Sequence, residues 1–215
     1  MGSIHIIMGP MFAGKTTALI DRVEDAQRLG QAVVVVKSAV DTRYSVDQVV
    51  THSGRRVPCF ALQRLGQLRG RLGEEAYRAV QVVAVDEAQF LEGLVDDVRA
   101  AAEEDGKTVI VAGLNGDFRR QRFGQILDLV PLSDTVKKLR GRCKFCEQPS
   151  LFTLRIAAST QQQLVGGADA YAPVCREHYH DLEAVRRAVA AGVGAAEHPE
   201  PEAKVAQAIA GVSQA

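Results

Sequence analysis

The sequence predicts an α/β protein with a parallel sheet, followed by a small metal-binding module. Short runs rich in valine and isoleucine alternate with segments that carry apolar residues at helical spacing. Parallel sheets with right-handed crossover helices produce this alternation. A glycine-rich loop follows the first apolar run, and paired cysteines appear only after residue 140.

The first three elements alternate between strand and helix. Ser3 to Met8 is a short apolar run typical of a buried strand. Thr16 to Leu29 has apolar residues at helical spacing and stops at Gly30, a residue that commonly ends helices. Ala32 to Lys37 contains four consecutive valines, which indicates a strand that is covered on both faces of the sheet.

The next elements continue the alternation. Leu62 to Val80 is polar and contains several glycines, so we expect a helix with indistinct ends. Val82 to Val85 predicts another buried strand. A helix is expected over Leu91 to Glu104, ending near Gly106, and a further valine-rich strand over Thr108 to Leu114.

The pattern changes after about Val130, where turn residues become frequent and the alternation ends. We therefore expect a main domain over residues 1–138 and a small module over residues 139–193, with a helix over Asp181 to Val193 packed on it. Residues 194–215 contain few large apolar side chains and predict a disordered tail.

Composition restricts the kind of protein. Lys and Arg total 26 and Asp and Glu total 26, so the formal net charge is zero and gives no general footprint for nucleic acid. No apolar run approaches the roughly 18 residues of a membrane span. The glycine loop begins at residue 9, which leaves no room for a signal peptide. We therefore expect a cytoplasmic protein with no membrane or nucleic-acid partner, whose cysteines are metal ligands or core residues.

The stretch GPMFAGKTT, residues 9–17, matches the phosphate-binding pattern G-x-x-x-x-G-K-[ST] between a predicted strand and a predicted helix. Backbone N–H groups of such a loop bind phosphate at a helix N-terminus. Lys15 can reach the β and γ phosphates, and the Thr16 hydroxyl can bind Mg²⁺. The pattern predicts that a nucleoside triphosphate binds here.

Two acidic residues follow the strand over Val82 to Val85. Asp86 can hold Mg²⁺, and Glu87 is either a surface carboxylate or a general base that takes a proton from an attacking hydroxyl. Residues 86–89 also resemble the acidic motif of helicase-like ATPases, in which the glutamate activates water. Phosphoryl transfer is favoured, because the chain has no room for the second lobe of such motors.

Two residue pairs in the module have the spacing of zinc ligands, Cys143-x-x-Cys146 and Cys175-x-x-His178. Four protein ligands indicate a structural site, which suits a small module with little core of its own. Unligated core cysteines are the plainer alternative. His180 competes for the fourth position, but His178 repeats the pair spacing and is preferred.

Six stretches, in order, resemble the zinc-containing, P-loop type of thymidine kinase. They are GPMFAGKTT, KSAVDTRYS (residues 37–45), VDEAQF (85–90), AGLNGDFRRQRFG (112–124), CKFC (143–146) and GGADAYAPVCREH (166–178). The resemblance covers about residues 3–190. It implies a P-loop (RecA-like) sheet with a zinc-binding lasso module, and transfer of the γ-phosphate of ATP to the 5′-hydroxyl of thymidine, giving dTMP in deoxynucleoside salvage.

The resemblance also implies the site residues. Glu87 would be the catalytic base, and Thr16 and Asp86 would hold Mg²⁺. The ATP-binding residues would be Gly9, Pro10, Met11, Phe12, Ala13, Gly14, Lys15, Thr16, Asp41, Arg43, Asp86 and Gln89, with Arg43 neutralising charge on the γ-phosphoryl group. The zinc ligands would be Cys143, Cys146, Cys175 and His178.

For the nucleoside, the resemblance implies an aromatic contact from Phe118, closure near the sugar by Tyr171, and backbone hydrogen bonds to the thymine edge. The residues with these backbone groups would be Gln162, Gln163, Leu164, Val165 and Gly166. Candidates for the pocket of the thymine methyl group are Met11, Leu114 and Thr153. The zinc would anchor both ends of the loop that closes over the nucleoside.

Assembly and regulation come from the resemblance alone. It implies a homotetramer and feedback inhibition by dTTP, a triphosphate that could span the nucleoside and phosphate sites at once. A related kinase for another deoxynucleoside is the enzyme alternative. A P-loop ATPase or nucleic-acid-binding switch with a zinc docking module is the alternative from another class.

Overall fold

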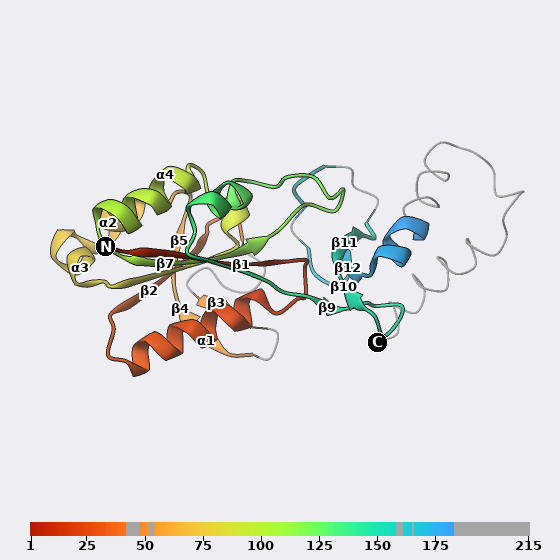
Figure 1. Ribbon diagram of the computed structural model, residues 1–215, viewed down its shortest axis with the longest axis horizontal. Helices are drawn as coiled ribbons and strands as arrows, with labels where there is room; N and C mark the ends of the chain where they lie inside the picture. The colour runs from red at the N-terminus through yellow and green to blue at the C-terminus, as the bar shows by residue number, and fades with distance from the viewer. Residues whose placement is uncertain (42–47, 52–53, 158–160, 165, 183–215) are drawn as a thin grey trace, which may run out of the picture.

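The computed structural model describes residues 1–41, 48–51, 54–157, 161–164 and 166–182. At its centre lies a six-stranded sheet, ordered β5-β2-β6-β7-β1-β8, in which every neighbouring pair is parallel (Figure 1). The strands are β1 (Ser3–Gly9), β2 (Val33–Ser38), β5 (Phe60–Leu62), β6 (Val82–Asp86), β7 (Thr108–Leu114) and β8 (Thr135–Lys138). The predicted α/β class with a parallel sheet is confirmed.

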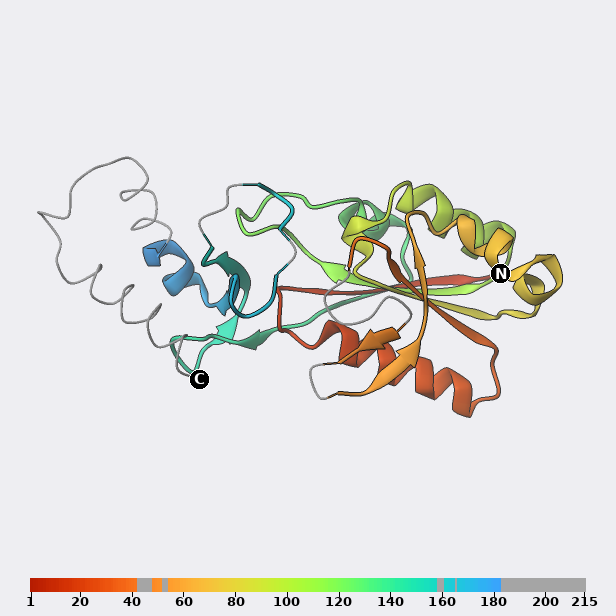
Figure 2. The same ribbon diagram turned by 180° about the vertical axis from the view of Figure 1, so that it is seen from behind.

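Helices cover both faces of this sheet (Figures 1 and 2). One face carries α1 (Lys15–Arg28). The other face carries α2 (Gln67–Leu72), α3 (Glu74–Ala79), α4 (Leu94–Arg99), the short helical segment η1 (Ala88–Phe90), the π-helical turn η2 (Ala100–Glu104) and the 3₁₀ segment η3 (Ile126–Leu132). Among the described residues, none of the helices combines the length and apolar character needed to cross a membrane.

Alternation along the strands divides the core into two layers. In β1, Ile4 and Ile6 pack with the layer of α2 and α4, whereas Ile7 packs with α1. The valines of β2 divide in the same way, because Val36 faces the first layer and Val35 the second. The strand with four consecutive valines is therefore buried on both faces, as the sequence predicts.

The helix predicted over Leu62 to Val80 is wrong. Leu62 ends β5, and the chain then forms two short helices, α2 and α3, that meet at Gly73. Gly73 has a φ of 82°, a conformation that interrupts a right-handed helix. The helix predicted over Leu91 to Glu104 begins three residues later, after Gly93, and widens into the π-helical turn η2.

An antiparallel hairpin was not expected. Strands β3 (Gln48–Val50) and β4 (Arg56–Pro58) pair with each other, and Val49 is buried in the core layer of α1. Arg55 in the turn forms ion pairs with Asp21 and Glu24 of α1. The hairpin brings the chain near residue 48 to the glycine loop.

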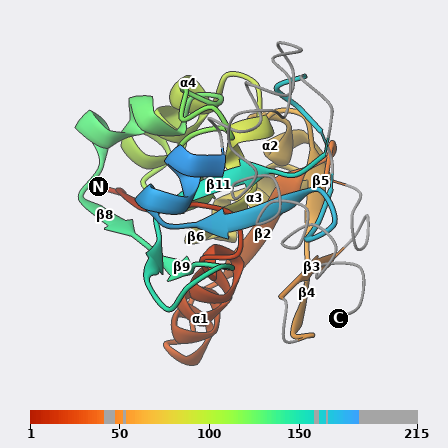
Figure 3. The ribbon, with the colours of Figure 1, turned by 90° about the vertical axis from the view of Figure 1, so that its right-hand side faces the viewer.

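The small module follows β8 and lies at one end of the sheet (Figure 1). It contains two antiparallel pairs, β9 (Gly141–Arg142) with β10 (Pro149–Ser150), and β11 (Phe152–Arg155) with β12 (Tyr171–Val174). Helical backbone covers residues 176–182, so the predicted helix begins before Asp181. Figure 3 views the protein from this end and places β11 in front of the central sheet. The predicted tail and residues 183–193 lie outside the described chain.

Candidate active site and metal centre

The glycine loop connects β1, which ends at Gly9, to α1, which begins at Lys15. Gly14 has a φ of 78°, so the turn into the helix uses a conformation that glycine adopts readily. A side chain at Gly9 would meet the carbonyl oxygen of Leu139 at 2.7 Å, which leaves room for glycine alone. Lys15 Nζ donates a hydrogen bond to the Pro10 carbonyl at 2.7 Å and therefore lies over the loop.

Thr16 and Asp86 form a pair of oxygen ligands at the start of α1 and the end of β6. Thr16 Oγ1 donates to Asp86 Oδ2 at 3.0 Å, and Asp86 is only 5% exposed. Burial raises the pKa of Asp86 above its ordinary value, and the neighbouring Glu87 charge raises it further. A divalent cation would favour the ionised carboxylate, and hydroxyl and carboxylate oxygens suit Mg²⁺. These residues therefore fit a magnesium ion.

Glu87 follows Asp86 in a left-handed backbone conformation, with a φ of 51°. Such a conformation is uncommon for a residue other than glycine and turns the chain sharply between β6 and η1. Gln89 Nε2 donates to Glu87 Oε2 at 2.5 Å, while Gln89 Oε1 accepts from the Leu114 N–H at 3.0 Å. The buried Gln89 thus fixes the Glu87 carboxylate relative to the end of β7.

Two clefts open at the carboxyl ends of the parallel strands, where ligands of parallel sheets commonly bind. The glycine-loop cleft is lined by Met11, Phe12, Gly14, Lys15, Thr16, Thr17, Lys37, Asp41, Gln48, Val49, Val50, Asp86, Glu87 and Leu114. The aromatic cleft is lined by Met11, Asp41, Glu87, Gln89, Phe90, Leu114, Gly116, Asp117, Phe118, Phe123, Thr153, Arg155, Gln162, Leu164, Gly166 and Tyr171. Met11, Asp41, Glu87 and Leu114 belong to both linings, so the two clefts share a wall that includes Glu87.

Most of the predicted nucleoside residues gather in the aromatic cleft. Its lining includes Phe118, Gln162, Leu164, Gly166 and Tyr171, together with all three candidates for the methyl pocket. Gln163 is not part of the lining, and Val165 lies outside the described residues. Gln162 already has hydrogen-bond partners. Its backbone carbonyl accepts from Arg155 at 3.0 Å, and its side-chain amide donates to Asp117 at 2.9 Å.

The predicted ATP-binding residues do not all line one cleft. The glycine-loop cleft includes Met11, Phe12, Gly14, Lys15, Thr16, Asp41 and Asp86 in its lining, whereas Gly9, Pro10 and Ala13 form the loop without lining the cleft. Gln89 lines the aromatic cleft and not the glycine-loop cleft. Arg43 lies outside the described residues.

Several lining residues were not anticipated as such. Lys37 lies at the end of β2, is 2% exposed, and donates to the Asp41 carbonyl at 3.1 Å inside the glycine-loop cleft. A lysine directly after a run of buried valines is a signal that sequence reasoning could have used, because ligands of parallel sheets bind at strand carboxyl ends. The aromatic residues Phe90 and Phe123, which pack edge to face at 5.2 Å, carry no such local signal.

The module touches the glycine loop directly. Thr153 of β11 accepts a hydrogen bond from the Met11 N–H at 2.9 Å through its hydroxyl oxygen. Both residues are buried, and both line the aromatic cleft. The strand β11, which lies in the segment between the two ligand pairs, is therefore hydrogen-bonded to the loop predicted to bind phosphate.

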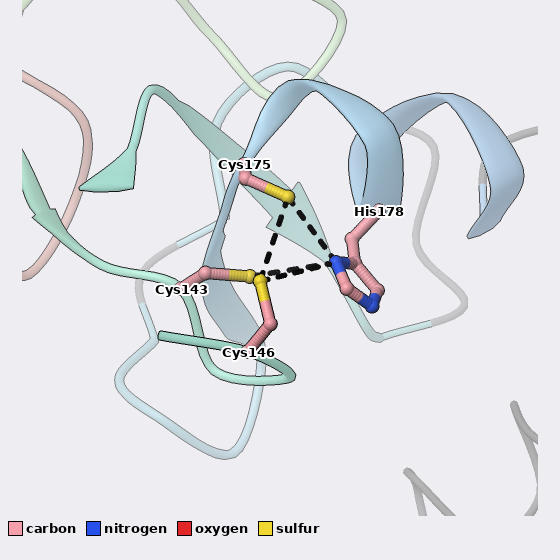
Figure 4. Close-up of side chains that lie close together, drawn as sticks. All are labelled: Cys143, Cys146, Cys175 and His178. Carbon is pink, nitrogen blue, oxygen red and sulfur yellow. Dashed lines mark hydrogen bonds between the residues drawn. The ribbon is translucent and has the colours of Figure 1, made fainter. Parts of the chain in front are cut away.

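The four predicted zinc ligands converge (Figure 4). Their ligand atoms all lie within 4.8 Å of one another, and the Nδ1 atom of His178 lies 3.8, 3.6 and 3.2 Å from the sulfurs of Cys143, Cys146 and Cys175. Zinc bonds of about 2.3 Å to sulfur and 2.0 Å to nitrogen place tetrahedral ligands roughly 3.5 to 3.8 Å apart. The cluster can hold a metal ion, and its geometry fits zinc.

Local charge and exposure support this ligand set. Burial acts to raise the pKa of the Cys143 thiol, but hydrogen bonds from the backbone N–H groups of Phe145 and Cys175 outweigh it and lower the pKa. A lowered pKa favours the thiolate at Cys143, which is the form that binds metal. At Cys146 a backbone hydrogen bond from Gln148 acts to lower the pKa, but burial and the sulfurs of Cys143 and Cys175 outweigh it and raise the pKa. The side chain of His180 is 81% exposed and lies beside Asp181, so His178 and not His180 completes the cluster.

Comparison with known proteins identifies the family. The family described as "Thymidine kinase" matches residues 2–179. "Thymidine kinase" of Oryza sativa subsp. japonica is 51% identical over 185 residues, which cover 86% of this chain and 68% of that protein. "Thymidine kinase a" of Arabidopsis thaliana is 47% identical (83% and 75% covered), and "Thymidine kinase, cytosolic" of Homo sapiens is 40% identical (83% and 73% covered). The chain belongs to the thymidine kinase family.

Proposed function

We propose that this protein transfers the γ-phosphate of ATP to the 5′-hydroxyl of thymidine. The observation that carries the proposal is the place of Glu87, which lines both clefts and whose carboxylate is held by Gln89. A base at the junction of a phosphate cleft and an apolar cleft can act on a hydroxyl group presented from one side to a phosphoryl group on the other. Membership of the thymidine kinase family supports thymidine as the acceptor.

The reaction follows from the positions of these residues. The glycine loop and Lys15 hold the triphosphate, and Thr16 and Asp86 hold Mg²⁺, which neutralises phosphate charge when bound. Glu87 accepts the proton of the 5′-hydroxyl as the 5′ oxygen bonds to the γ phosphorus. The bond from the γ phosphorus to its bridging oxygen breaks, and ADP leaves. Arg43 is proposed to offset charge on the transferred group.

The aromatic cleft is proposed to hold the nucleoside. Its wall of Phe90, Phe118 and Phe123 is apolar, and Met11 and Leu114 are buried beside it, which suits a pyrimidine with a methyl group. Tyr171 and Leu164 also line the cleft, and their polar groups can meet the sugar and the base edge. This second, apolar cleft favours an alcohol acceptor over water.

Release of ADP, measured with ATP and Mg²⁺ and with each deoxynucleoside in turn, tests the proposal. We expect release that depends on thymidine, with dTMP formed in equal amount. Dependence on a different deoxynucleoside would assign another kinase activity, and release without any nucleoside would assign an ATPase. Stimulation by DNA or RNA in the absence of thymidine would exclude the proposed function.

The metal centre is proposed to hold structural zinc that anchors the segment between the two ligand pairs. Cys143 and Cys146 precede that segment, and Cys175 and His178 follow it. The segment includes Thr153, Arg155 and Tyr171 of the aromatic cleft, so fixing its two ends organises the nucleoside site. Metal analysis of the purified protein is expected to give one zinc per chain, and a protein without zinc would exclude this role.

We further propose a cytoplasmic homotetramer that is inhibited by dTTP, with no nucleic-acid or membrane partner. The family supports the assembly, and relatives named cytosolic support the location. The two clefts share a wall that includes Glu87, so a thymine nucleotide can place its base in one and its phosphates in the other. Light scattering measures the assembly. Inhibition by dTTP that is not relieved by added ATP or thymidine would contradict binding across both clefts.

A further inference from the structure

Arg155, the last residue of β11, is a cationic side chain with only 1% of its surface exposed. Burying a charge is costly unless the charged group is hydrogen-bonded in a fixed arrangement. Its guanidinium lines the aromatic cleft but not the glycine-loop cleft. The acceptors around it come from the segment 161–164 and from β12.

The hydrogen bonds of Arg155 fix the backbone of segment 161–164. Its Nη atoms donate to the carbonyls of Gln161 and Gln162, the latter at 3.0 Å, and to the Tyr171 hydroxyl at 2.6 Å. The Tyr171 hydroxyl in turn donates to the Leu164 carbonyl at 2.8 Å. Three of the four carbonyls in this segment are therefore held by Arg155, directly or through Tyr171.

Arg155 also contacts the aromatic wall of the cleft. Its Cζ atom lies 3.8 Å from the centre of the Phe118 ring and 5.1 Å from that of Tyr171. A guanidinium over a ring face is an attractive arrangement, particularly where both groups are buried. One side chain thus joins the aromatic wall, the tyrosine and the loop, which reach the cleft from three separate parts of the chain.

We propose that Arg155 is the positioning residue of the nucleoside site, which sets the distance between the Phe118 wall and segment 161–164 before thymidine binds. This inference rests on the proposed function. Only arginine provides a planar fork whose donors reach separate acceptors while its face covers a ring. Because Arg155 does not line the glycine-loop cleft, its loss weakens the binding of thymidine and leaves the binding of ATP unchanged.

Arg155→Met tests this, since methionine keeps an apolar stem and removes the donors. We expect the KM for thymidine to rise about tenfold or more, the scale of losing one hydrogen bond from a charged donor. The KM for ATP, measured with saturating thymidine, stays within about twofold of wild type. Arg78→Met is the matched control, because Arg78 is 77% exposed in an ion pair on α3, and it should change neither constant.

Two further variants keep the test decisive. Arg155→Lys retains the charge without the fork and is expected to resemble Arg155→Met, so a wild-type KM for thymidine in that variant would overturn the proposal. Tyr171→Phe removes only the hydroxyl between Arg155 and Leu164, and it should raise the KM for thymidine severalfold without changing that for ATP. If circular dichroism shows that Arg155→Met does not fold, Arg155→Lys decides, because Tyr171 can also contact the nucleoside directly.

The result also separates this inference from the proposed function. A wild-type chain without thymidine-dependent ADP release would remove the proposed function. A wild-type chain with that activity, whose Arg155 and Tyr171 variants show parallel changes in both KM values or no change in either, would remove the positioning role alone.

Discussion

Replacing Glu87 by glutamine removes the proposed base while keeping the size of the side chain. Gln89 Nε2 donates to one carboxylate oxygen of Glu87, and the amide oxygen of a glutamine can accept the same hydrogen bond. The φ of 51° is already imposed by the turn between β6 and η1, so the variant keeps the wild-type backbone. The change therefore acts on proton transfer and leaves the architecture of the site intact.

The expected loss in kcat is on the order of 10²- to 10⁴-fold, the range for general acid–base catalysis. This corresponds to about 2.7 to 5.5 kcal/mol in the activation barrier. The KM for thymidine should remain close to the wild-type value, because the aromatic wall and segment 161–164 are untouched. Steady-state ADP release, with thymidine and ATP varied separately, measures both constants.

Glu92→Gln is the matched control, since Glu92 is an exposed carboxylate five residues further along the chain. It should leave kcat unchanged. A near-normal kcat in Glu87→Gln would refute the assignment of Glu87 as the base. A large rise in the KM for thymidine with little change in kcat would mean that Glu87 binds the nucleoside rather than accepting its proton.

Four other substitutions test the metal centre and the architecture. Cys143→Ser should lose zinc by metal analysis and raise the KM for thymidine; zinc loss with normal thymidine kinetics would separate the metal from the nucleoside site. Thr153→Val deprives the buried Met11 N–H of its acceptor and should lower the free energy of unfolding by about 1 to 3 kcal/mol in urea titrations, whereas an unchanged midpoint would count against that bond. Gly73→Ala should destabilise by about 1 to 3 kcal/mol, because a φ of 82° with a ψ of 158° lies in a region that is essentially restricted to glycine. Gly70→Ala, in the open interior of α2, should stabilise by about 0.5 to 1 kcal/mol. Equal effects of the two alanines would contradict the backbone argument.

Features that depend on neighbours in the chain could be predicted from the sequence. The four predicted zinc ligands are an example, because each of the two pairs can be recognised from its own short spacing along the chain. The glycine loop and Asp86 are others, since a strand and its following turn define them. The valine run of β2 likewise indicates a strand buried on both faces, which the two core layers confirm.

Features that depend on distant contacts could not be predicted in the same way. Gln89 and Arg155 occur in no spacing pattern that indicates their bonds, because their partners Leu114 and Tyr171 come from other strands. The place of Lys37 could not be predicted from the valine run alone, because the run indicates a buried strand but not that the lysine after the valines faces a cleft. The prediction of one helix across Gly73 is wrong because a single glycine can either end a helix or lie inside one. The spacing of apolar residues does not distinguish between these two possibilities.

The hydrogen bond between Thr153 and Met11 has a consequence for how the two substrates influence each other. Met11 belongs to the glycine loop and lines both clefts. Its backbone N–H is hydrogen-bonded to Thr153 of β11. A ligand in either cleft therefore contacts Met11, which also lines the other cleft. Any preference that ATP creates for thymidine must be matched by an equal preference of the thymidine complex for ATP, because the binding free energies form a closed cycle.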